Sequence, residues 1–411
     1  MSNTQFSELP ISPALQQRLS AAGFSTATPV QAAAIPPALE GKDVLATAQT
    51  GTGKTLAFLI PMMEQLAKNN LPGISALVLV PTRELAMQVA EQHNALRGKK
   101  LPPCALVVGG LSENTQLKAI RAGARVVVAT PGRLEDFLGR RLVDLRGVRM
   151  LVLDEADRML DMGFLPALRR IVAALPKKRQ TLCFSATLEA SVAHLVNDYM
   201  QNPERVALGS TLKPAANVRL QAFEVTAQTK ANVLQRLLAR EKGRCLVFTR
   251  TKRGADRVAR VLNRDGFSAT MIHGDRSQSQ RTAALTGFQQ GRFQVLVATD
   301  LASRGIHVDE VAHVINYDLP AIPEDFIHRV GRTARAGASG VASTLIELHQ
   351  GTELKQLERT LGLRIERKRG DQEPAVDRDS QREVAAVNPL VMGRRSSSLS
   401  VLPGEILQNA R

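Results

Sequence analysis

Residues 43–66 read DVLATAQTGTGKTLAFLIPMMEQL, and this stretch decides the fold. An apolar run suited to a buried strand leads into a glycine-containing turn, and an apolar helical pattern follows. In such a turn the backbone N–H groups point inward around phosphate groups, and a lysine neutralises their charge. The stretch therefore predicts a strand, a phosphate-binding loop of the Walker A kind and a helix. The predicted loop residues are Ala48, Gln49, Thr50, Gly51, Thr52, Gly53, Lys54 and Thr55, and Ala48 replaces the usual first glycine.

The same alternation of short β-branched runs and longer amphipathic stretches continues along the chain. It includes ALVLVPT, ARVVVATP, MLVLDEAD and TLCFSAT, and after residue 220 it starts again with RCLVFT, QVLVATD and HVINYD. Strands that alternate with helices indicate a parallel sheet covered on both faces. We therefore predict an α/β protein with a domain at 1–208, a linker at 209–219, a second domain at 220–364 and a disordered tail at 365–411.

Charge indicates the class of partner. The 411 residues carry a net charge of +16, divided as +6 over 1–208, +9 over 209–364 and +1 over the tail. Such an excess favours a polyanion, either nucleic acid or an anionic membrane surface, although a surface charged only for solubility is an alternative explanation. Aromatic residues make up only 3% of the chain, which leaves little material for stacking bases. A bound nucleic acid would therefore be held by its backbone.

Location and redox state follow from what the sequence lacks. It has no long uncharged apolar run and no signal-peptide pattern, so we expect a cytoplasmic protein without membrane association. The cysteines Cys104, Cys183 and Cys245 lie far apart inside apolar runs, which predicts reduced core residues.

A second acidic element complements the phosphate loop. In MLVLDEAD, four apolar residues precede Asp154, Glu155 and Asp157 at the predicted carboxyl end of a strand, where parallel sheets bind ligands. Asp154, together with Thr55, would hold Mg²⁺, and Glu155 would orient and polarise an attacking water. Acidic residues at a strand end also act simply as helix caps, but the phosphate loop upstream favours the catalytic interpretation.

With these motifs the chain resembles the DEAD-box ATP-dependent RNA helicases, from about Phe6 to Arg364, and among bacterial members it is most similar to the RhlE type. The resemblance implies two tandem RecA-like domains, ATP and Mg²⁺ as cofactors, and RNA as the partner. It implies an RNA-dependent ATPase that locally and non-processively unwinds short duplexes or remodels RNA–protein complexes. Ribosomal or RNA-decay assemblies are candidate partners.

The resemblance also assigns the nucleotide site. GFSTATPVQ at 23–31 matches the Q motif, so that Gln31 would read the adenine edge, Phe24 would pack on the ring, and Thr28 and the upstream Phe6 would belong to the same site. From the second domain, Gly305 would contact the nucleotide. HRVGRTAR at 328–335 matches the arginine-finger motif, and we expect Arg332 and Arg335 on one helix face to reach the γ-phosphate.

Further family motifs are implied to bind RNA or to couple it to ATP. PTREL and TPGR alone would indicate helix starts with a capping threonine. An arginine of these motifs would add charge or order its loop through an acidic partner such as Glu84. The RNA-facing residues would be Pro81, Thr82, Arg83, Gly109, Gly110, Thr130, Pro131, Gly132, Arg133, Arg250, Gly274, Gln278, Arg281 and Thr299. The coupling residues would be Asp157, Ser185, Thr187 and His328, although Ser185 and Thr187 could equally cap the next helix.

The chain departs from the family at two places. Ile306 and then His307 follow SRG, where an apolar residue and a ribose-contacting aspartate are usual, and Asp309 comes two residues too late. Ala334 replaces a common glycine, a change that we expect a helix to tolerate.

Three alternative functions remain open at this stage. They are a DNA-directed or translocating helicase, an RNA clamp or assembly factor whose slow ATPase serves as a timer, and a metabolic phosphate-loop kinase. The kinase offers no role for the arginine motif of the second domain.

Overall fold

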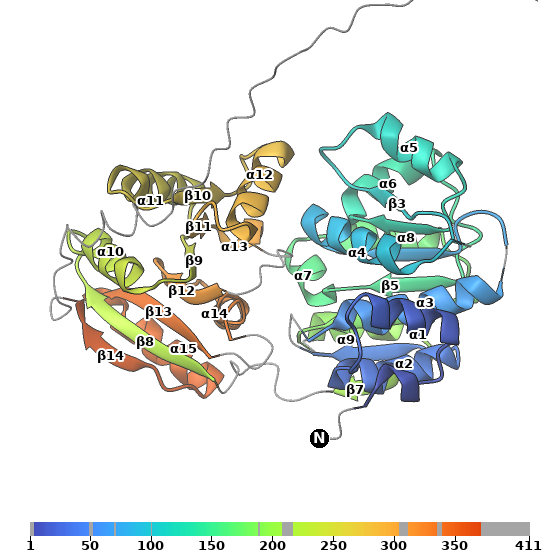
Figure 1. The fold of residues 1–411 in the computed structure, drawn as a ribbon, viewed down its shortest axis with the longest axis horizontal. Coiled ribbons are helices and arrows are strands. Elements are labelled where there is room, and N and C mark those ends of the chain that lie inside the picture. The colour runs from blue at the N-terminus through green and yellow to red at the C-terminus, as the bar shows by residue number, and fades with distance from the viewer. Residues whose placement is uncertain are drawn as a thin grey trace, which may run out of the picture. The chain divides into compact units, whose positions relative to one another are not determined.

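The computed structural model describes residues 4–48, 52–69, 71–99, 101–187, 190–207, 217–303, 311–334 and 339–370. They form two seven-stranded sheets in which every pairing is parallel, flanked by helices, so the predicted fold class is confirmed (Figure 1). One compact unit spans Met1–Pro374.

The first sheet has the strand order β3-β4-β2-β5-β6-β1-β7. Its strands are β1 (Val44–Thr47), β2 (Ala76–Leu79), β3 (Ala105–Val107), β4 (Val126–Ala129), β5 (Met150–Leu153), β6 (Gln180–Ser185) and β7 (Glu204–Ala207). Its helices are η1 (Phe6–Glu8), α1 (Pro13–Ala21), α2 (Pro29–Leu39), α3 (Lys54–Lys68), α4 (Arg83–Leu96), α5 (Glu113–Arg121), α6 (Pro131–Gly139), α7 (Ala156–Asp161), α8 (Leu165–Ala173) and α9 (Ala190–Tyr199).

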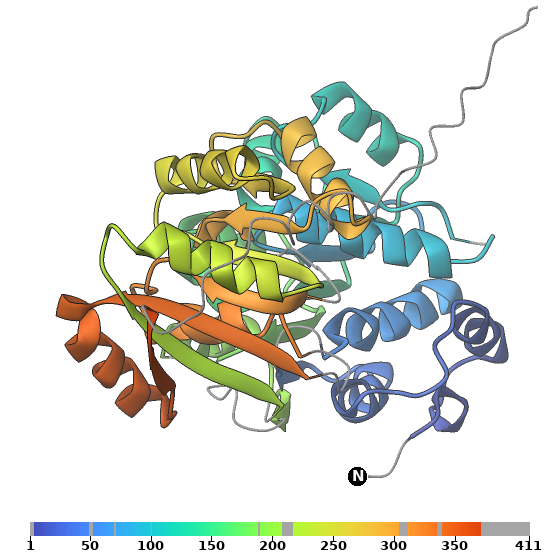
Figure 2. The ribbon, with the colours of Figure 1, turned by 60° about the vertical axis from the view of Figure 1, so that its left-hand side comes forward.

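The second sheet has the order β10-β11-β9-β12-β13-β8-β14. Its strands are β8 (Val218–Val225), β9 (Arg244–Phe248), β10 (Ala269–Ile272), β11 (Val295–Ala298), β12 (Val311–Asn316), β13 (Gly340–Glu347) and β14 (Glu366–Arg369). Its helices are α10 (Lys230–Arg240), α11 (Lys252–Arg264), α12 (Gln278–Gln289), α13 (Asp300–Ser303), α14 (Pro323–Val330), η2 (Leu348–Gln350) and α15 (Gly351–Leu361). The two longest strands, β8 and β13, run side by side at the lower left of Figure 2.

The pleat of the strands explains why helices cover both faces of each sheet. In β1, Val44 and Ala46 pack into one hydrophobic cluster with residues of α2 and α3, whereas Leu45 packs into another with residues of α6, α8 and α9. In β9, Leu246 packs with residues of α14 and α15, and Val247 packs with residues of α10 and α11. Successive side chains of a strand point to opposite faces, so a continuous apolar run requires helices on both sides.

The structure corrects the predicted start of the tail. Residues 366–369, which we expected to be disordered, form β14 and pair with β8 at the edge of the second sheet. The preceding Ile365 is buried, and backbone hydrogen bonds with β8 do not require apolar side chains in an edge strand. Charge composition alone therefore misplaced this boundary. The rest of the tail and most of the predicted linker lie outside the described residues, and β8 begins at Val218, inside that linker.

The sequence also led to expectations about membrane-spanning segments and about the cysteines. In the part of the chain that the structure describes, no helix is both long and apolar enough to cross a membrane. Cys104, Cys183 and Cys245 are all buried and unpaired, as predicted. Burial raises the pKa of the Cys104 thiol to about 11, which makes it an inert core residue.

Candidate functional site

The predicted phosphate loop connects β1 to α3. Gly53 precedes α3 with φ of 88°, a left-handed conformation that favours glycine, and Lys54 is the first helical residue. The buried Lys54 ammonium donates a hydrogen bond to the carbonyl oxygen of Ala48 at 3.0 Å, so the lysine side chain points back toward the end of β1. Thr52 and Thr55 are half-buried beside it. Gln49, Thr50 and Gly51, also predicted to bind phosphate, lie outside the described residues.

Gln31 ties this loop to the preceding helix. Its side-chain amide donates to the carbonyl oxygen of Gly53 at 2.9 Å, while its carbonyl oxygen accepts the backbone N–H of Thr28 at 2.8 Å. A Cβ atom on Gly53 would collide with the Gln31 amide. The structure thus brings the predicted adenine-reading residue into contact with the phosphate loop, a contact that sequence reasoning did not anticipate.

The two predicted aromatic contacts differ in exposure. Phe6 is 3% exposed and belongs to the hydrophobic core of the first sheet, so packing accounts for its position. Phe24 is only partly buried and packs against that core from its edge. Phe24 therefore offers more accessible ring surface than Phe6.

Asp154 and Glu155 follow β5 directly and are both buried. Burial raises the pKa of Asp154 to about 7, although the neighbouring Lys54 acts in the opposite direction. Burial also acts to raise the pKa of Glu155, but the positive charges of Arg158 and Lys54 outweigh it and hold that pKa below its ordinary value. Two adjacent carboxyl groups in one buried site therefore differ in their affinity for a proton.

Arg158 is the partner of Glu155 that sequence reasoning missed. Its guanidinium donates to Glu155 Oε2 at 2.9 Å, and both side chains are buried. Glu155 has φ of 53°, an uncommon conformation for a residue with a side chain, and it immediately precedes α7. The spacing of three residues across the start of a helix was the signal that could have identified this pair.

Asp157 links α7 to the end of β6. Its Oδ2 accepts the backbone N–H groups of Ala186 at 2.9 Å and Thr187 at 3.0 Å, and the Thr187 hydroxyl at 3.3 Å. The Ser185 hydroxyl is buried without a hydrogen-bond partner in the described structure. Of the predicted coupling residues Ser185 and Thr187, only Thr187 therefore contacts Asp157 through its hydroxyl within the described residues, and backbone groups supply the remaining contacts.

The predicted RNA-facing loops of the first domain follow β2, β3 and β4, which are neighbours in the sheet. The Arg83 guanidinium lies against Gly109 and Gly110, and a Cβ atom at Gly110 would collide with it. Thr82 caps α4 by accepting the backbone N–H of Leu85 at 3.3 Å. Three predicted RNA-facing segments thus meet at one edge of the first sheet, with Pro81 buried there.

TPGR begins α6, with Thr130 preceding the helix, Pro131 buried and Gly132 exposed. Arg133 lies 3.5 Å from Glu113 and 5.5 Å from the centre of the Phe137 ring. The acidic partner that orders this loop is therefore Glu113.

In the second domain, the ends of β9, β10 and β11 surround a surface pocket of about 640 Å³. Its lining residues are Arg250, Thr251, Lys252, Arg253, Gly274, Asp275, Thr299 and Asp300. Arg250, Gly274 and Thr299 were predicted from three separate motifs, and the pocket brings them together. Gln278 and Arg281 lie in the first turn of the adjacent α12, and Arg281 donates to the carbonyl oxygen of Ala302 at 3.4 Å.

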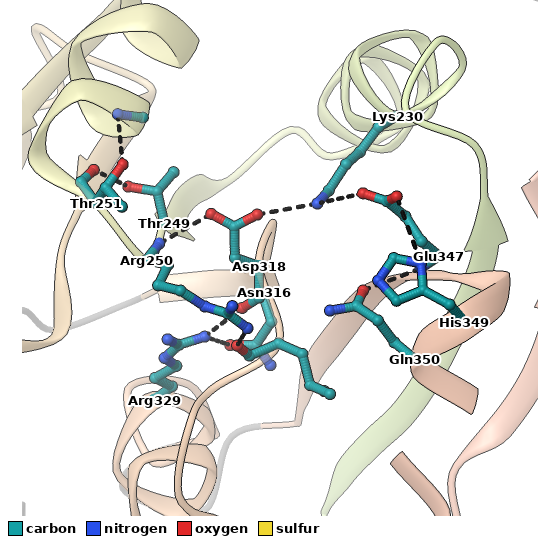
Figure 3. Close-up of polar contacts among 12 residues, drawn as sticks. Lys230, Thr249, Arg250, Thr251, Asn316, Asp318, Arg329, Glu347, His349 and Gln350 are labelled. Carbon is teal, nitrogen blue, oxygen red and sulfur yellow. Dashed lines mark hydrogen bonds and ion pairs between the residues drawn. The ribbon is translucent and has the colours of Figure 1, made fainter. Parts of the chain in front are cut away.

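Asp318, which follows β12, fixes the position of the Arg250 loop (Figure 3). One of its carboxylate oxygens accepts the backbone N–H of Arg250 at 2.9 Å, and the other accepts the Lys230 ammonium at 2.9 Å. Lys230 is buried against the Tyr317 ring, 4.7 Å from its centre. Lysine is rarely buried without a charged partner, so this pair is a structural tie that no sequence motif indicated.

Arg329 connects the same region to α14. Its guanidinium donates to Asp300 Oδ2 at 2.7 Å and to the backbone carbonyl of Asp318 at 2.7 Å. It also lies 5.1 Å from the centre of the Phe248 ring. Asp300, next to Thr299, and Asp318, which holds Arg250, are therefore both anchored to α14, the helix in which the arginine motif begins.

The expectation of a continuous arginine helix was wrong. α14 ends at Val330, the buried Arg332 lies in the turn after it, and Ala334 has φ of 56°, outside any helix. Thr333 forms a bridge with Val311 at the start of β12 and donates its hydroxyl to the Val311 carbonyl, and this tertiary contact draws the chain out of the helix. His328 lies half-buried near the end of α14. Arg335, Gly305, Ile306, His307 and Asp309 lie outside the described residues.

Comparisons with known proteins identify the family. The family model for the DEAD/DEAH box helicases matches residues 28–195, and that for the helicase conserved C-terminal domain matches residues 229–337. The chain is 40% identical over 373 residues to the DEAD-box ATP-dependent RNA helicase CshA of Bacillus subtilis, covering 90% of this chain and 75% of that protein. CshA of Geobacillus kaustophilus is also 40% identical, with 89% and 78% covered.

Solved structures agree. Dbp5 of S. cerevisiae, bound to RNA and ADP BeF3, has a TM-score of 0.82 at 29% identity and covers 93% of this chain and 99% of its own. Mss116p bound to ssRNA and AMP-PNP has a TM-score of 0.79 at 26% identity, with 94% and 82% covered. The two sheets are thus tandem RecA-like domains. On its sequence identity, its family models and its fold, the chain belongs to the DEAD-box ATP-dependent RNA helicases.

Proposed function

We propose that this chain is an RNA-dependent ATPase that separates short RNA duplexes locally and non-processively, or remodels RNA–protein complexes. The observation that carries this proposal is the buried group of Lys54, Asp154 and Glu155 in the first domain. It supplies a phosphate-neutralising cation, an acid with a raised pKa and an ionised carboxylate. A buried carboxylate held by Arg158 is suited to orient an attacking water.

Mg²⁺ fits this site. Mg²⁺ prefers oxygen ligands and is usually bound by one or two carboxylates together with substrate phosphates and waters. Thr55 and Asp154 are the candidate ligands, and within the described ranges no cluster of three or more His, Cys, Asp or Glu residues competes for a metal. A bound cation would also offset the cost of ionising buried Asp154. Bound Mg²⁺ would neutralise charge on the β- and γ-phosphates.

RNA is the proposed partner because the predicted contacts are sugar–phosphate contacts. Dbp5 and Mss116p were solved with RNA and ssRNA, respectively. In this chain, Arg250, Lys252 and Arg253 line one pocket, and Thr82 and Arg83 lie by a glycine pair in the first domain. Arginine donors and backbone N–H groups bind phosphates without reading bases. We therefore propose weak sequence preference.

Bound ATP would keep the RNA strand in its site until hydrolysis. With both ligands bound, Arg332 and Arg335 would place positive charge at the γ-phosphate, a contribution of about 10³ to 10⁵ in rate for arginine fingers generally. The RNA strand would be held in a conformation that a strand within a duplex cannot adopt. ATP hydrolysis would then release the strand. Cytoplasmic location and ribosomal or RNA-decay assemblies remain predictions of the sequence.

Steady-state ATPase measurements with and without RNA test the proposal. We expect RNA to stimulate turnover at least tenfold, and Glu155→Gln to lower kcat by about 10² to 10⁴ with ATP binding retained. Glu353→Gln, an exposed change on α15, is the matched control. Absence of RNA stimulation would favour an RNA clamp, and equal unwinding from DNA and RNA loading strands would favour a DNA-directed helicase.

A further inference from the structure

One face of α11 carries four arginines. Arg253, Arg257, Arg260 and Arg264 follow each other at intervals of four, three and four residues, and all four are exposed. At 3.6 residues per turn, they fall within an arc of about 60°. The buried residues Ala255, Val258, Ala259 and Leu262 occupy the opposite face. The arginines therefore form a single stripe along the solvent side of the helix.

This stripe lacks the acidic residues that would balance it. Asp256 is the single acid in the 13-residue helix, and its carboxylate pairs with Arg276 at 2.9 Å and His273 at 3.1 Å. Arg264 pairs with Asp265 at 3.0 Å, whereas Arg253, Arg257 and Arg260 form no ion pair within the described residues. Like charges three and four residues apart destabilise a helix, as do cations in its first turn. An ordinary solvated face would interleave acidic residues and avoid this repulsion.

The stripe is continuous with the pocket at the ends of β9, β10 and β11. Arg253 lines that pocket together with Arg250 and Lys252. From Arg253 to Arg264 the helix rises about 16 Å, a length that faces several phosphates of one strand. The basic surface therefore begins inside the proposed RNA site and leads away from it along α11.

The composition of the stripe favours a nucleic-acid backbone over a protein. Arginine presents a planar fork of donors that matches phosphate geometry. A protein partner would need an apolar centre to its interface, yet the large exposed hydrophobic residues of the described structure, Leu71, Leu111, Ile322 and Leu348, all lie outside α11.

We propose that Arg257, Arg260 and Arg264, together with Arg253, form an accessory surface that binds the sugar–phosphate backbone of RNA extending beyond the strand held in the pocket. This inference rests on the proposed RNA-binding function. Binding there is independent of base sequence and of the nucleotide state. It lengthens the RNA footprint of the protein without changing the chemistry at Glu155.

The test compares short and long RNA on one variant. Arg257→Gln, Arg260→Gln and Arg264→Gln are combined, and Arg253 is left intact because it lines the pocket. Affinities for 6-nucleotide and 20-nucleotide oligouridine are measured by fluorescence anisotropy over a range of salt, with a non-hydrolysable ATP analogue present. Single-stranded RNA contributes a slope of about −0.7 in log K against log salt for each phosphate contact. For the 20-mer, we expect the slope to become shallower by about 2 and the affinity to fall about tenfold, while the 6-mer changes less than twofold.

Two further variants serve as controls. Lys355→Gln, Arg359→Gln and Arg364→Gln remove three exposed charges on and after α15, and we expect no change with either RNA. Replacing Arg257, Arg260 and Arg264 by lysine keeps the charge, and we expect it to restore most of the slope. Glutamine favours helices, and thermal unfolding checks that the stripe variant remains folded.

Each other outcome has a defined meaning. If the glutamine variant bound the 20-mer with the same salt dependence as the wild type, the inference would be overturned. Equal losses for 6-mer and 20-mer would also overturn it, because the stripe would then belong to the pocket. If polyglutamate binds the wild type through the stripe while RNA binding is unaffected, an acidic protein is the partner instead. Failure of the wild type to bind either RNA would contradict the proposed function itself.

Discussion

At the residue scale, the candidate site is held by contacts between residues that lie far apart in the sequence. The strand pattern placed Asp154 directly after β5, where the structure has it, whereas Lys54 and Asp157 lie in the first turns of α3 and α7. It did not reveal that Gln31 contacts Gly53, because the two residues are 22 positions apart and meet only through folding. Nor did it reveal the left-handed backbone of Glu155.

Ala334 gives a prediction about backbone strain. A left-handed conformation costs a residue with a Cβ atom about 1–2 kcal/mol, whereas glycine loses about 0.5–1 kcal/mol through its freer unfolded chain. With φ of 56° at Ala334, we expect Ala334→Gly to raise the free energy of unfolding by up to about 1 kcal/mol, measured by urea denaturation. Ala239→Gly in α10 should have the opposite sign, because glycine disfavours a helix. Destabilisation by Ala334→Gly would show that the alanine methyl group makes a compensating contact.

At the element scale, the strands were predictable and the ends of two elements were not. Continuous apolar runs such as VLVA and MLVL have only one stable environment, a sheet covered on both faces. The end of α14 depends instead on the bridge between Thr333 and Val311, and β14 depends on pairing with β8. Both are long-range contacts that override local composition.

The tie between α10 and the loop after β9 gives a prediction about RNA binding. Lys230→Met removes the ammonium from Asp318 and loosens the backbone of Arg250. We expect the RNA KM of the ATPase to rise about tenfold, a change of about 1.4 kcal/mol, while kcat at saturating RNA and the ATP KM stay within twofold. Steady-state kinetics over a matrix of RNA and ATP concentrations separates these constants.

Three controls accompany the Lys230 variant. Lys230→Arg should retain most RNA affinity, because it keeps the charge beside Asp318. Lys355→Met removes an exposed lysine of the same domain and should have no effect. Thermal unfolding measures any loss of stability directly. A rise in the ATP KM with an unchanged RNA KM would refute the positioning role.

His313 gives a prediction about pH. It lies on β12, and its Nε2 is 2.7 Å from the Ser343 hydroxyl on β13. Burial lowers the pKa of His313 to about 4 from 6.5. Between pH 6.5 and 4 the unfolded chain binds a proton that the folded chain excludes, so stability falls with decreasing pH by up to about 3 kcal/mol.

Urea denaturation at a series of pH values between 7 and 4 measures this loss. His313→Gln keeps a hydrogen-bonding group and should flatten the decline over that window. The exposed His194 is the matched control, and His194→Gln should leave the decline unchanged. An identical pH profile for His313→Gln and the wild type would assign the acid sensitivity to other groups.

At the scale of the whole molecule, charge and length anticipated two domains and a polyanionic partner, but composition misplaced the end of the second domain. The net charge of +16 lies almost entirely within residues 1–364. The compact unit nevertheless includes β14, which lies beyond Arg364. The ERKR sequence of β14 is as polar as a disordered tail, yet the backbone of this strand forms the hydrogen bonds of a sheet.

Two truncations separate these boundaries. A chain ending at Pro374 keeps β14 and loses only residues 375–411, whose net charge is +1. We expect it to unfold at the same temperature as the full chain. Its slope of log K against log salt for RNA binding should change by less than about 0.7, the value for one phosphate contact. A chain ending at Arg364 loses β14 and the buried Ile365, exposes the edge of β8, and should unfold at a lower temperature. Calorimetry measures the unfolding temperatures, and salt-dependent fluorescence anisotropy measures the slopes. If the slope of the chain ending at Pro374 became shallower by the equivalent of two or more phosphate contacts, residues 375–411 would contain RNA contacts.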